Sequence, residues 1–295
     1  MSSIIYKKNK KFYILLCLPA IVFYTLSVLY PLIGVTLPAS FFNWNILEGT
    51  KQFNGIENYI RLFKEEAFRD AMFFTLKLAV VTVLGSNILA FMVAYFLQAK
   101  IFAKGLSRAG FFIPNIINGI MVSFVWSFIF IQGIPILAKK IGFEKLASLS
   151  WFGTPSMAAV SVFIVTIWQG MGFIMIIYVA GMQSVSQELI EAAELEGCNR
   201  LQKVLYVVIP MMMPTITVCL FVSIAGAFKA FDIPFALTSG GPSRSTATVA
   251  LNIYDTAFTS FRTGYASAKS IVLFILVMIV ALIQLRCTRK KEVQL

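Results

Sequence analysis

Four glutamates stand within nine residues of a chain that is otherwise poor in charge. The run from 187 to 196 is rich in strong helix formers and Gly197 is a natural helix stop, so the pattern predicts a short helix with exposed carboxylates, followed by a turn. Such a helix would present negative charge to a basic partner, and a solvated loop without a partner fits the composition equally well. The charged residues of this link, 182–203, are Glu188, Glu191, Glu194, Glu196, Arg200 and Lys203.

Polar side chains inside long apolar segments form a second group of interest. They are costly in hydrocarbon and are therefore functional candidates by default. Structural roles also fit some of them, since amides that follow Pro114 can satisfy the backbone carbonyls that a proline leaves free. Lysine and aspartate three residues apart can likewise form a structural ion pair. The group comprises Asn115, Asn118, Trp168, Gln169, Ser223, Lys229 and Asp232.

Several kinds of chemistry are excluded by what the sequence lacks. It contains no histidine, so imidazole general bases and histidine metal sites are impossible. Its four cysteines show no C-x-x-C spacing, and no G-x-x-x-x-G-K-[ST] phosphate loop occurs. We therefore predict no catalytic residues, no metal site, no bound cofactor and no ATP hydrolysis by this chain. Nucleic-acid binding is a poor explanation of the net charge of +12, because many basic residues lie at the chain ends beside apolar segments.

The elements that position these residues are predicted to be membrane helices. The 295 residues are 59% hydrophobic and 13% charged, far more apolar than a soluble domain. A spanning helix needs about 20 largely apolar residues, and its backbone groups must pair within the segment. The expected fold class is an all-α membrane protein with six transmembrane helices, at 12–35, 71–97, 109–132, 156–181, 204–230 and 266–286.

Basic residues predict the orientation in the membrane. They concentrate in the N-terminal tail, the 98–108 link and the C-terminal tail, and an even number of spans puts all three on one side. Both termini and the 182–203 link are therefore expected in the cytoplasm. The first segment is long for a signal peptide and lacks an A-x-A site, so we expect a retained helix. The residues behind this prediction are Lys7, Lys8, Lys10, Lys11, Lys100, Lys104, Arg108, Arg286, Arg289, Lys290 and Lys291. Lys77 and Lys269, near span ends, are expected to extend their amines to water.

We divide the chain into three parts. Residues 1–70 hold the N-terminal tail, the first transmembrane helix and an external loop. Residues 71–286 form a five-helix core that contains the 182–203 loop, and 287–295 form a basic cytoplasmic tail.

The acidic link resembles the EAA signature of permease subunits of bacterial ABC importers. That signature is E-A-A, three residues, Gly, nine residues, then I-x-L-P. The chain has Glu191, Ala192 and Ala193, then Gly197, and ends the pattern with Val207-Val208-Ile209-Pro210. Two further stretches resemble carbohydrate-type permeases of the maltose and glycerol-phosphate group: Leu237-Thr238-Ser239-Gly240-Gly241-Pro242, and Phe53-Asn54-Gly55-Ile56-Glu57-Asn58-Tyr59.

The resemblance implies a type I ABC importer permease fold and a multi-pass protein of the bacterial cytoplasmic (inner) membrane. It implies a heterodimer with a second homologous permease, two ATP-binding cassette subunits that use ATP and Mg, and an extracytoplasmic sugar-binding protein. The EAA helix would dock on the ATPase. Glu191 would pair with a basic residue there, Ala192 and Ala193 would permit close approach of the helix to the ATPase, and Gly197 would supply the turn. Pro210 closes the motif within the fifth span.

The resemblance also assigns the solute, a di- or oligosaccharide, to spans beside this loop. Trp168 and Gln169 together offer an aromatic face and an amide, which suit sugar C–H patches and hydroxyls. Gly240, Gly241 and Pro242 would lie near the docking surface for the binding protein, although a turn without a partner also fits. The alternative function is an ion-coupled secondary transporter of a small polar solute, which would need inverted repeats or intramembrane acids that the sequence does not show.

Overall fold

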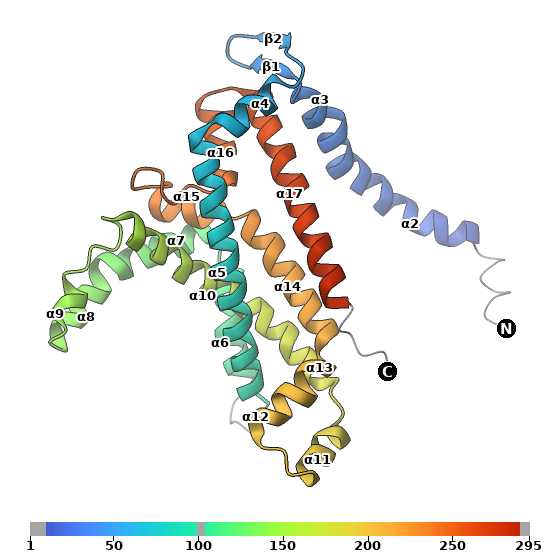
Figure 1. Cartoon of the computed structure of the whole chain (residues 1–295), viewed down its shortest axis with the longest axis vertical. Coiled ribbons are helices and arrows are strands. Elements are labelled where there is room, and N and C mark those ends of the chain that lie inside the picture. Colours follow the sequence, from blue (N-terminus) through green and yellow to red (C-terminus); the bar gives the residue numbers. More distant parts are fainter. Residues whose placement is uncertain (1–9, 99–103, 290–295) are drawn as a thin grey trace. The chain divides into compact units, whose positions relative to one another are not determined.

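The computed structural model describes residues 10–98 and 104–289 (Figure 1). The topology residues Lys7, Lys8, Lys100, Lys290 and Lys291 lie outside the described residues. The chain divides into two units: residues 1–64 with 253–272, and residues 65–252 with 273–295. The boundary after Lys64 is near the expected division at 70, whereas 253–272 group with the N-terminal residues and not with the core.

The first unit begins with a long apolar helical segment and continues through a β-hairpin to a short helix. Its strands pair antiparallel, with Phe42 opposite Phe53 and Asn45 opposite Thr50. The all-α prediction therefore omits one small sheet. The elements are α2 Lys10–Tyr24, the π-helix η1 Thr25–Thr36, α3 Leu37–Ala39, β1 Phe42–Asn45, β2 Thr50–Phe53, α4 Glu57–Lys64, the end of α16 Val249–Tyr254, the π-helix η4 Asp255–Thr259 and the start of α17 Thr263–Arg289.

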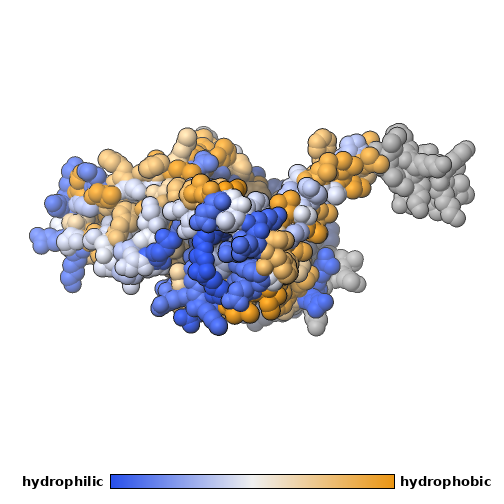
Figure 2. All heavy atoms as spheres, turned by 90° about the horizontal axis from the view of Figure 1, so that it is seen from above, coloured by the Kyte–Doolittle hydropathy of each residue, from blue (hydrophilic) through white to orange (hydrophobic). Residues whose placement is uncertain are grey.

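The F-x-G-x-x-N-Y stretch holds this hairpin. The buried Asn58 Nδ2 donates to Ser40 O at 2.8 Å and to Phe42 O at 2.9 Å, and the hydroxyls of Tyr59 and Ser40 lie 2.6 Å apart. These bonds join α4 to the chain that enters β1. Figure 2 looks onto this end and shows hydrophilic side chains gathered over it, bordered by hydrophobic ones.

Lys269 does not extend its amine to water, so that prediction is wrong. The residue is only 1% exposed, its Nζ donates to Thr256 Oγ1 at 3.0 Å, and the same Nζ lies 4.5 Å from the ring centroid of Tyr265. The hydroxyl and the aromatic face replace the water that a lysine amine normally keeps. Lys77, in contrast, is exposed, and its Nζ lies 5.9 Å from the ring centroid of Phe163.

The second unit is built on three long helices that pack pairwise, α5, α10 and α14. One apolar core joins residues from all three, and a second joins α5 and α10 to the α7 and α15 regions. The elements are α5 Glu66–Phe96, α6 Lys104–Ile116, α7 Gly119–Phe128, the π-helix η2 Ile129–Gly133, α8 Ile134–Lys140, α9 Glu144–Ala147, α10 Pro155–Gln183, α11 Gln187–Leu195, α12 Arg200–Lys203, the π-helix η3 Val204–Val208, α13 Ile209–Met211, α14 Met213–Phe228, α15 Asp232–Thr238, α16 Val249–Tyr254 and the end of α17.

Five helices of the described residues are long and apolar enough to cross a membrane, and a bent pair brings the total to six. The bent pair, Arg200–Met211 with Met213–Phe228, turns by 76°. This break lies between Pro210 and Pro214, neither of which has a backbone N–H to continue the helical bonding. The predicted fifth span is therefore a broken helix.

The third predicted span, 109–132, is also interrupted. Helix α6 contains Pro114 and ends at Ile116, and a new helix begins at Gly119. Asn118 caps the new helix because its Oδ1 accepts the N–H of Ile120 at 2.8 Å. The apolar segment that is long enough to span runs from Gly119 to Lys140 instead.

Candidate functional site

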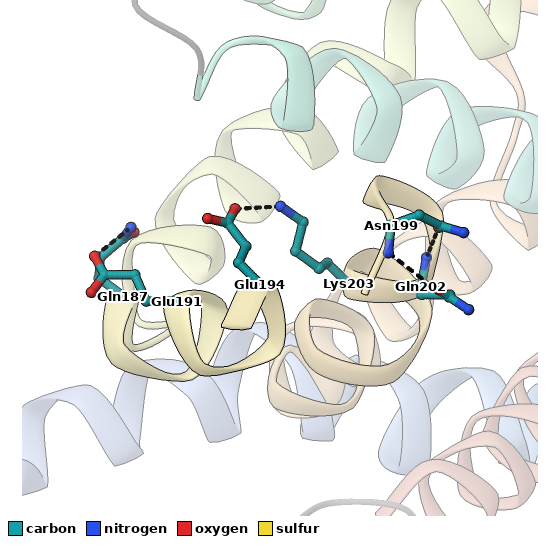
Figure 3. Close-up of polar contacts among 6 residues, drawn as sticks. All are labelled: Gln187, Glu191, Glu194, Asn199, Gln202 and Lys203. Atoms are coloured by element: carbon teal, nitrogen blue, oxygen red, sulfur yellow. Dashed lines mark hydrogen bonds and ion pairs between the residues drawn. The ribbon is translucent and has the colours of Figure 1, made fainter. Parts of the chain in front are cut away.

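The acidic link forms a short helix, a glycine turn and a second short helix (Figure 3). Helix α11 ends in a Schellman motif: Cys198 N–H donates to Ala193 O, and Gly197 N–H donates to Glu194 O, both at 3.0 Å. Gly197 has φ +81°, in the left-handed region that glycine occupies without strain. The E-A-A-x-x-x-G spacing therefore covers the C-terminal part of α11 and the glycine turn that ends the helix.

Side-chain bonds fix the turn on both sides. Glu194 of α11 forms an ion pair with Lys203 of α12 (Figure 3). Asn199 and Gln202 form a reciprocal capping box at the start of α12, with bonds of 2.9 and 2.8 Å. The two helices of the loop are therefore held at a defined angle to each other.

The outer surface of the loop has no cover within the described chain. Glu191 and Ala192 are exposed, and none of the residues of α11 is buried. Leu195 is 91% exposed and Tyr206, on η3, is 73% exposed. Exposed large apolar side chains among carboxylates are typical of a protein-binding surface.

Two adjoining polar pockets lie between the long helices, with volumes of about 220 and 230 Å³. They share the residues Thr166, Gln169 and Gly226, so they lie side by side along α10 and α14, and we call them together the polar cavity. Of the residues expected from the sequence, the first pocket contains Asn115, Gln169 and Ser223, and the second contains Gln169, Lys229 and Asp232.

Trp168 and Asn118 are not among the residues that line these pockets. Trp168 packs edge to face on Trp126, with ring centroids 5.4 Å apart, and Asn118 caps α7. The α10 residues of the first pocket lie on one face of the helix, at Thr166, Gln169, Gly170, Phe173 and Ile174, and at about 100° per residue Trp168 lies off that face. The structure therefore separates the aromatic ring from the amide that the sequence places beside it.

Gln169 anchors the broken third segment to α10. Its Nε2 donates to Ile117 O at 2.9 Å, and Asn115 Nδ2 donates to Gln169 O at 3.4 Å. The free carbonyl at the helix break is thus satisfied from another helix. Gly172 permits the close approach, because a Cβ there would lie 2.0 Å from Phe111 O of α6.

Lys229 and Asp232 do not form the structural ion pair that their spacing allows: both are described, and the structure records no ion pair between them. Both are exposed and line the same pocket. Asp232 packs against Gly119, where a Cβ would lie 2.9 Å from the aspartate Cβ. The second pocket therefore contains one basic and one acidic side chain.

Two residues that the sequence analysis missed are Asn87 and Tyr178. The Tyr178 hydroxyl donates to Asn87 Oδ1 at 2.8 Å, and Asn87 Nδ2 donates to Ser223 Oγ at 2.9 Å. The signal was present, because Asn87 is an amide inside an apolar span, as Asn115 is.

The glycine turn at 240–242 is tied inward. Thr246 N–H donates to Gly240 O at 3.0 Å, Thr246 Oγ1 donates to Gly241 O at 2.8 Å, and Gly240 is buried. The exposed residues beside it are Ser239, Ser243 and Arg244. Any partner at this turn would meet these three side chains together with Pro242, which is partly exposed.

Residues 87–292 match the family described as binding-protein-dependent transport system inner membrane component. The chain belongs to this family. It is 33% identical over 290 residues to the probable starch degradation products transport system permease protein AmyD of Thermoanaerobacterium thermosulfurigenes, covering 98% of this chain and 97% of that protein. It is 35% identical over 254 residues to the multiple sugar-binding transport system permease protein MsmF of Streptococcus mutans, covering 86% and 87%.

The fold is that of a solved ABC transporter. A chain in the crystal structure of a bacterial ABC transporter involved in import of the acidic polysaccharide alginate superimposes with a TM-score of 0.78, at 21% identity and 97% coverage of both chains. This binding-protein-dependent permease is the non-catalytic, multi-pass inner membrane component of an ABC transporter, whose ATPase resides on partner subunits. Family membership also sets aside the ion-coupled carrier.

Proposed function

We propose that this permease is one half of the translocation pathway of an ATP-driven importer for di- or oligosaccharides. The proposal for the solute is supported by the relatives, whose names refer to starch degradation products and to multiple sugars. The two pockets support it chemically, since amides and hydroxyls, the groups that bind sugar hydroxyls, alternate in their lining with apolar side chains that suit sugar C–H patches. One base and one acid in the second pocket favour a solute without net charge.

The observation that carries the coupling mechanism is the braced, exposed loop between α10 and α14 (Figure 3). Helix α11 docks in a groove of the partner ATPase, where Glu191 pairs with a base and Ala192 and Ala193 allow close approach. Leu195, which is 91% exposed, adds apolar contact area. Gly197 supplies the turn that sets the direction of α12, and Pro210 begins the break before α14.

The assembly contains a second, homologous permease, two copies of the ATPase, which use ATP and Mg, and an external sugar-binding protein. An even number of spans puts both termini on the same side as the α11 loop, in the cytoplasm. Closure of the ATPases on ATP would then move this loop and the helices attached to it, giving alternating access. The turn at Gly240, Gly241 and Pro242 lies on the opposite side, where the binding protein docks against its exposed edge.

Within the permease, the solute passes Asn115, Gln169 and Ser223 in the first pocket and Lys229 and Asp232 in the second. Trp168 and Asn118 support this path without lining it, the first through its contact with Trp126 and the second as a helix cap.

Purification of the tagged permease with its neighbours tests the assembly. We expect it to co-isolate with an ATPase and a second EAA-bearing permease. A panel of maltotriose, a uronate oligosaccharide, a polyol and glycerol phosphate then tests the solute, through thermal stabilisation of the binding protein and ATP-dependent uptake into proteoliposomes. Uptake that needs an ion gradient and no ATPase would contradict the proposal, as would stabilisation by none of the saccharides.

A further inference from the structure

A buried polar cluster joins the three long helices of the second unit. It consists of Asn87 on α5, Tyr178 on α10 and Ser223 on α14, and we call it the Asn87 cluster. Asn87 and Tyr178 are buried, and Ser223 is partly buried where it lines the first pocket. Each of the three helices contributes one side chain, and the hydrogen bonds among these three side chains run between helices.

Both polar atoms of the Asn87 amide have hydrogen-bond partners. Its oxygen accepts from the Tyr178 hydroxyl at 2.8 Å, and its nitrogen donates to Ser223 Oγ at 2.9 Å and to Val83 O at 2.8 Å. Ser223 Oγ in turn donates to Cys219 O at 2.8 Å. Water does not readily enter between packed helices to replace a lost partner. Removal of one of these polar groups therefore leaves another polar group without that hydrogen bond, which costs free energy.

The three side chains lie at one depth along their helices. Near this depth, residues that line the first pocket are followed by residues of the apolar core. On the side of α5 that precedes Asn87, Thr82 and Ser86 line the first pocket, and on the side that follows it, Ala90, Ala94 and Leu97 are packed in an apolar core. In α10 the pocket residues end at Ile174, and the apolar core begins at Ile174 and Met175 and continues past Tyr178 to Val179 and Met182. In α14, which runs in the opposite sense, the core residues Met212 and Cys219 precede Ser223, and Gly226 follows it in the pocket. The Asn87 cluster is thus the floor of the polar cavity.

The same core reaches both ends of the α11 loop. Met182 lies at the end of α10, just before α11, and Val208 and Met212 lie just after α12. All three pack in one core with Ala94 and Leu97 of α5. The loop is therefore attached through this core to the level of Asn87.

Resting on the proposed function, we infer that Asn87 is a positioning residue for energy coupling. It ties α5, α10 and α14 into one body at the floor of the pocket. A displacement of the α11 loop by the ATPase then moves the pocket-lining segments of all three helices together. Without these hydrogen bonds, the α11 loop still moves and ATP is still hydrolysed, but the pocket no longer opens and closes once for each movement of the loop.

The readout that separates coupling from plain stability is the number of ATP molecules hydrolysed per sugar imported. The experiment uses the complete transporter in proteoliposomes, with its binding protein and the panel sugar that the wild type accumulates. Asn87→Leu removes the amide at similar volume, and Tyr178→Phe removes the hydroxyl that donates to Asn87 Oδ1. Ser123→Ala is the matched control, because its buried hydroxyl bonds only to Gly119 O within α7, at 2.8 Å.

We expect ATP per sugar to rise at least about fivefold for Asn87→Leu and about twofold or more for Tyr178→Phe, while Ser123→Ala keeps the wild-type ratio. Addition of Tyr178→Phe to Asn87→Leu should raise the ratio no further, because the bond is already absent. If the transporter with Asn87→Leu does not assemble, the ATP-per-sugar ratio of Tyr178→Phe tests the inference alone. Uptake and hydrolysis that fall together at a constant ratio would overturn the inference and leave the cluster a structural brace. A wild type that hydrolyses ATP but imports no panel saccharide would overturn the proposed function itself, and this inference with it.

Discussion

The turn at Gly197 permits a test of coupling by backbone strain alone. A Cβ at this position would have no atom within 4 Å, so Gly197→Ala adds no clash. It does force an alanine to φ +81°, which costs about 1–2 kcal/mol for a residue with a side chain. Since about 1.4 kcal/mol corresponds to a factor of ten, the fraction of loops with the docking turn should fall roughly 5- to 30-fold relative to other conformers.

The chain offers a matched control for this substitution. Gly142, in the turn between α8 and α9, has φ +74° and likewise no atom within 4 Å of a Cβ. Gly142→Ala therefore introduces the same strain outside the loop. Gly197→Asn is the rescue variant, because asparagine tolerates left-handed backbone better than alanine does.

The assay measures binding of the purified ATPase to the permease complex in nanodiscs, together with ATP-driven uptake. We expect Gly197→Ala to weaken binding roughly 5- to 30-fold, Gly197→Asn to recover most of it, and Gly142→Ala to have no effect. An equal loss of ATPase binding in Gly197→Ala and Gly142→Ala would refute the reasoning, since backbone strain anywhere in the permease would then explain the defect. Wild-type affinity of Gly197→Ala for the ATPase would refute it as well.

Three further predictions concern other parts of the chain. Glu191→Lys should leave the amount of permease in the membrane unchanged and abolish ATP-driven uptake, measured by immunoblot and transport; normal uptake would contradict the role of this carboxylate. Gln169→Leu leaves Ile117 O unpaired and removes an amide from both pockets, so the KM for uptake should rise about tenfold or more; an unchanged KM would exclude Gln169 from the solute path. Asn58→Leu removes three hydrogen bonds, to Ser40 O, to Phe42 O and from Asn54 Nδ2, and should lower the stability of the hairpin by about 2–3 kcal/mol, seen as faster proteolysis there, whereas the exposed Asn43→Leu should not; equal rates would argue against the brace.

Local residue chemistry predicted the acidic link well. The short helix expected over 187–196 is found at Gln187–Leu195, and the turn falls at Gly197 as expected. Helix formers and a left-handed glycine act over a few residues, so the sequence carries this information directly. The Glu194–Lys203 ion pair depends on how the turn folds back, which the spacing alone does not reveal.

Apolar length predicted the membrane segments but not their breaks. The segment from 109 to 132 is apolar throughout, yet Asn118 can cap a helix, and with Pro114 nearby the chain begins a new one at Gly119. The hairpin escaped prediction because each strand is only four residues long, and β2 is exposed along its length. Its stability comes from the distant Asn58, which no local pattern connects to β1.

The pocket shows which rule would have sharpened the sequence analysis. On α10 the lining residues are Thr166, Gln169, Gly170, Phe173 and Ile174, which follow the spacing of one helical face. Trp168 lies off this face, although it neighbours Gln169 in the sequence. The same rule applied to α5 joins Thr82 and Ser86 to the pocket and places Asn87 one position to the side, toward Tyr178 and Ser223. Pairing polar residues by helical face, rather than by adjacency, would have found both the solute path and the cluster that forms its floor.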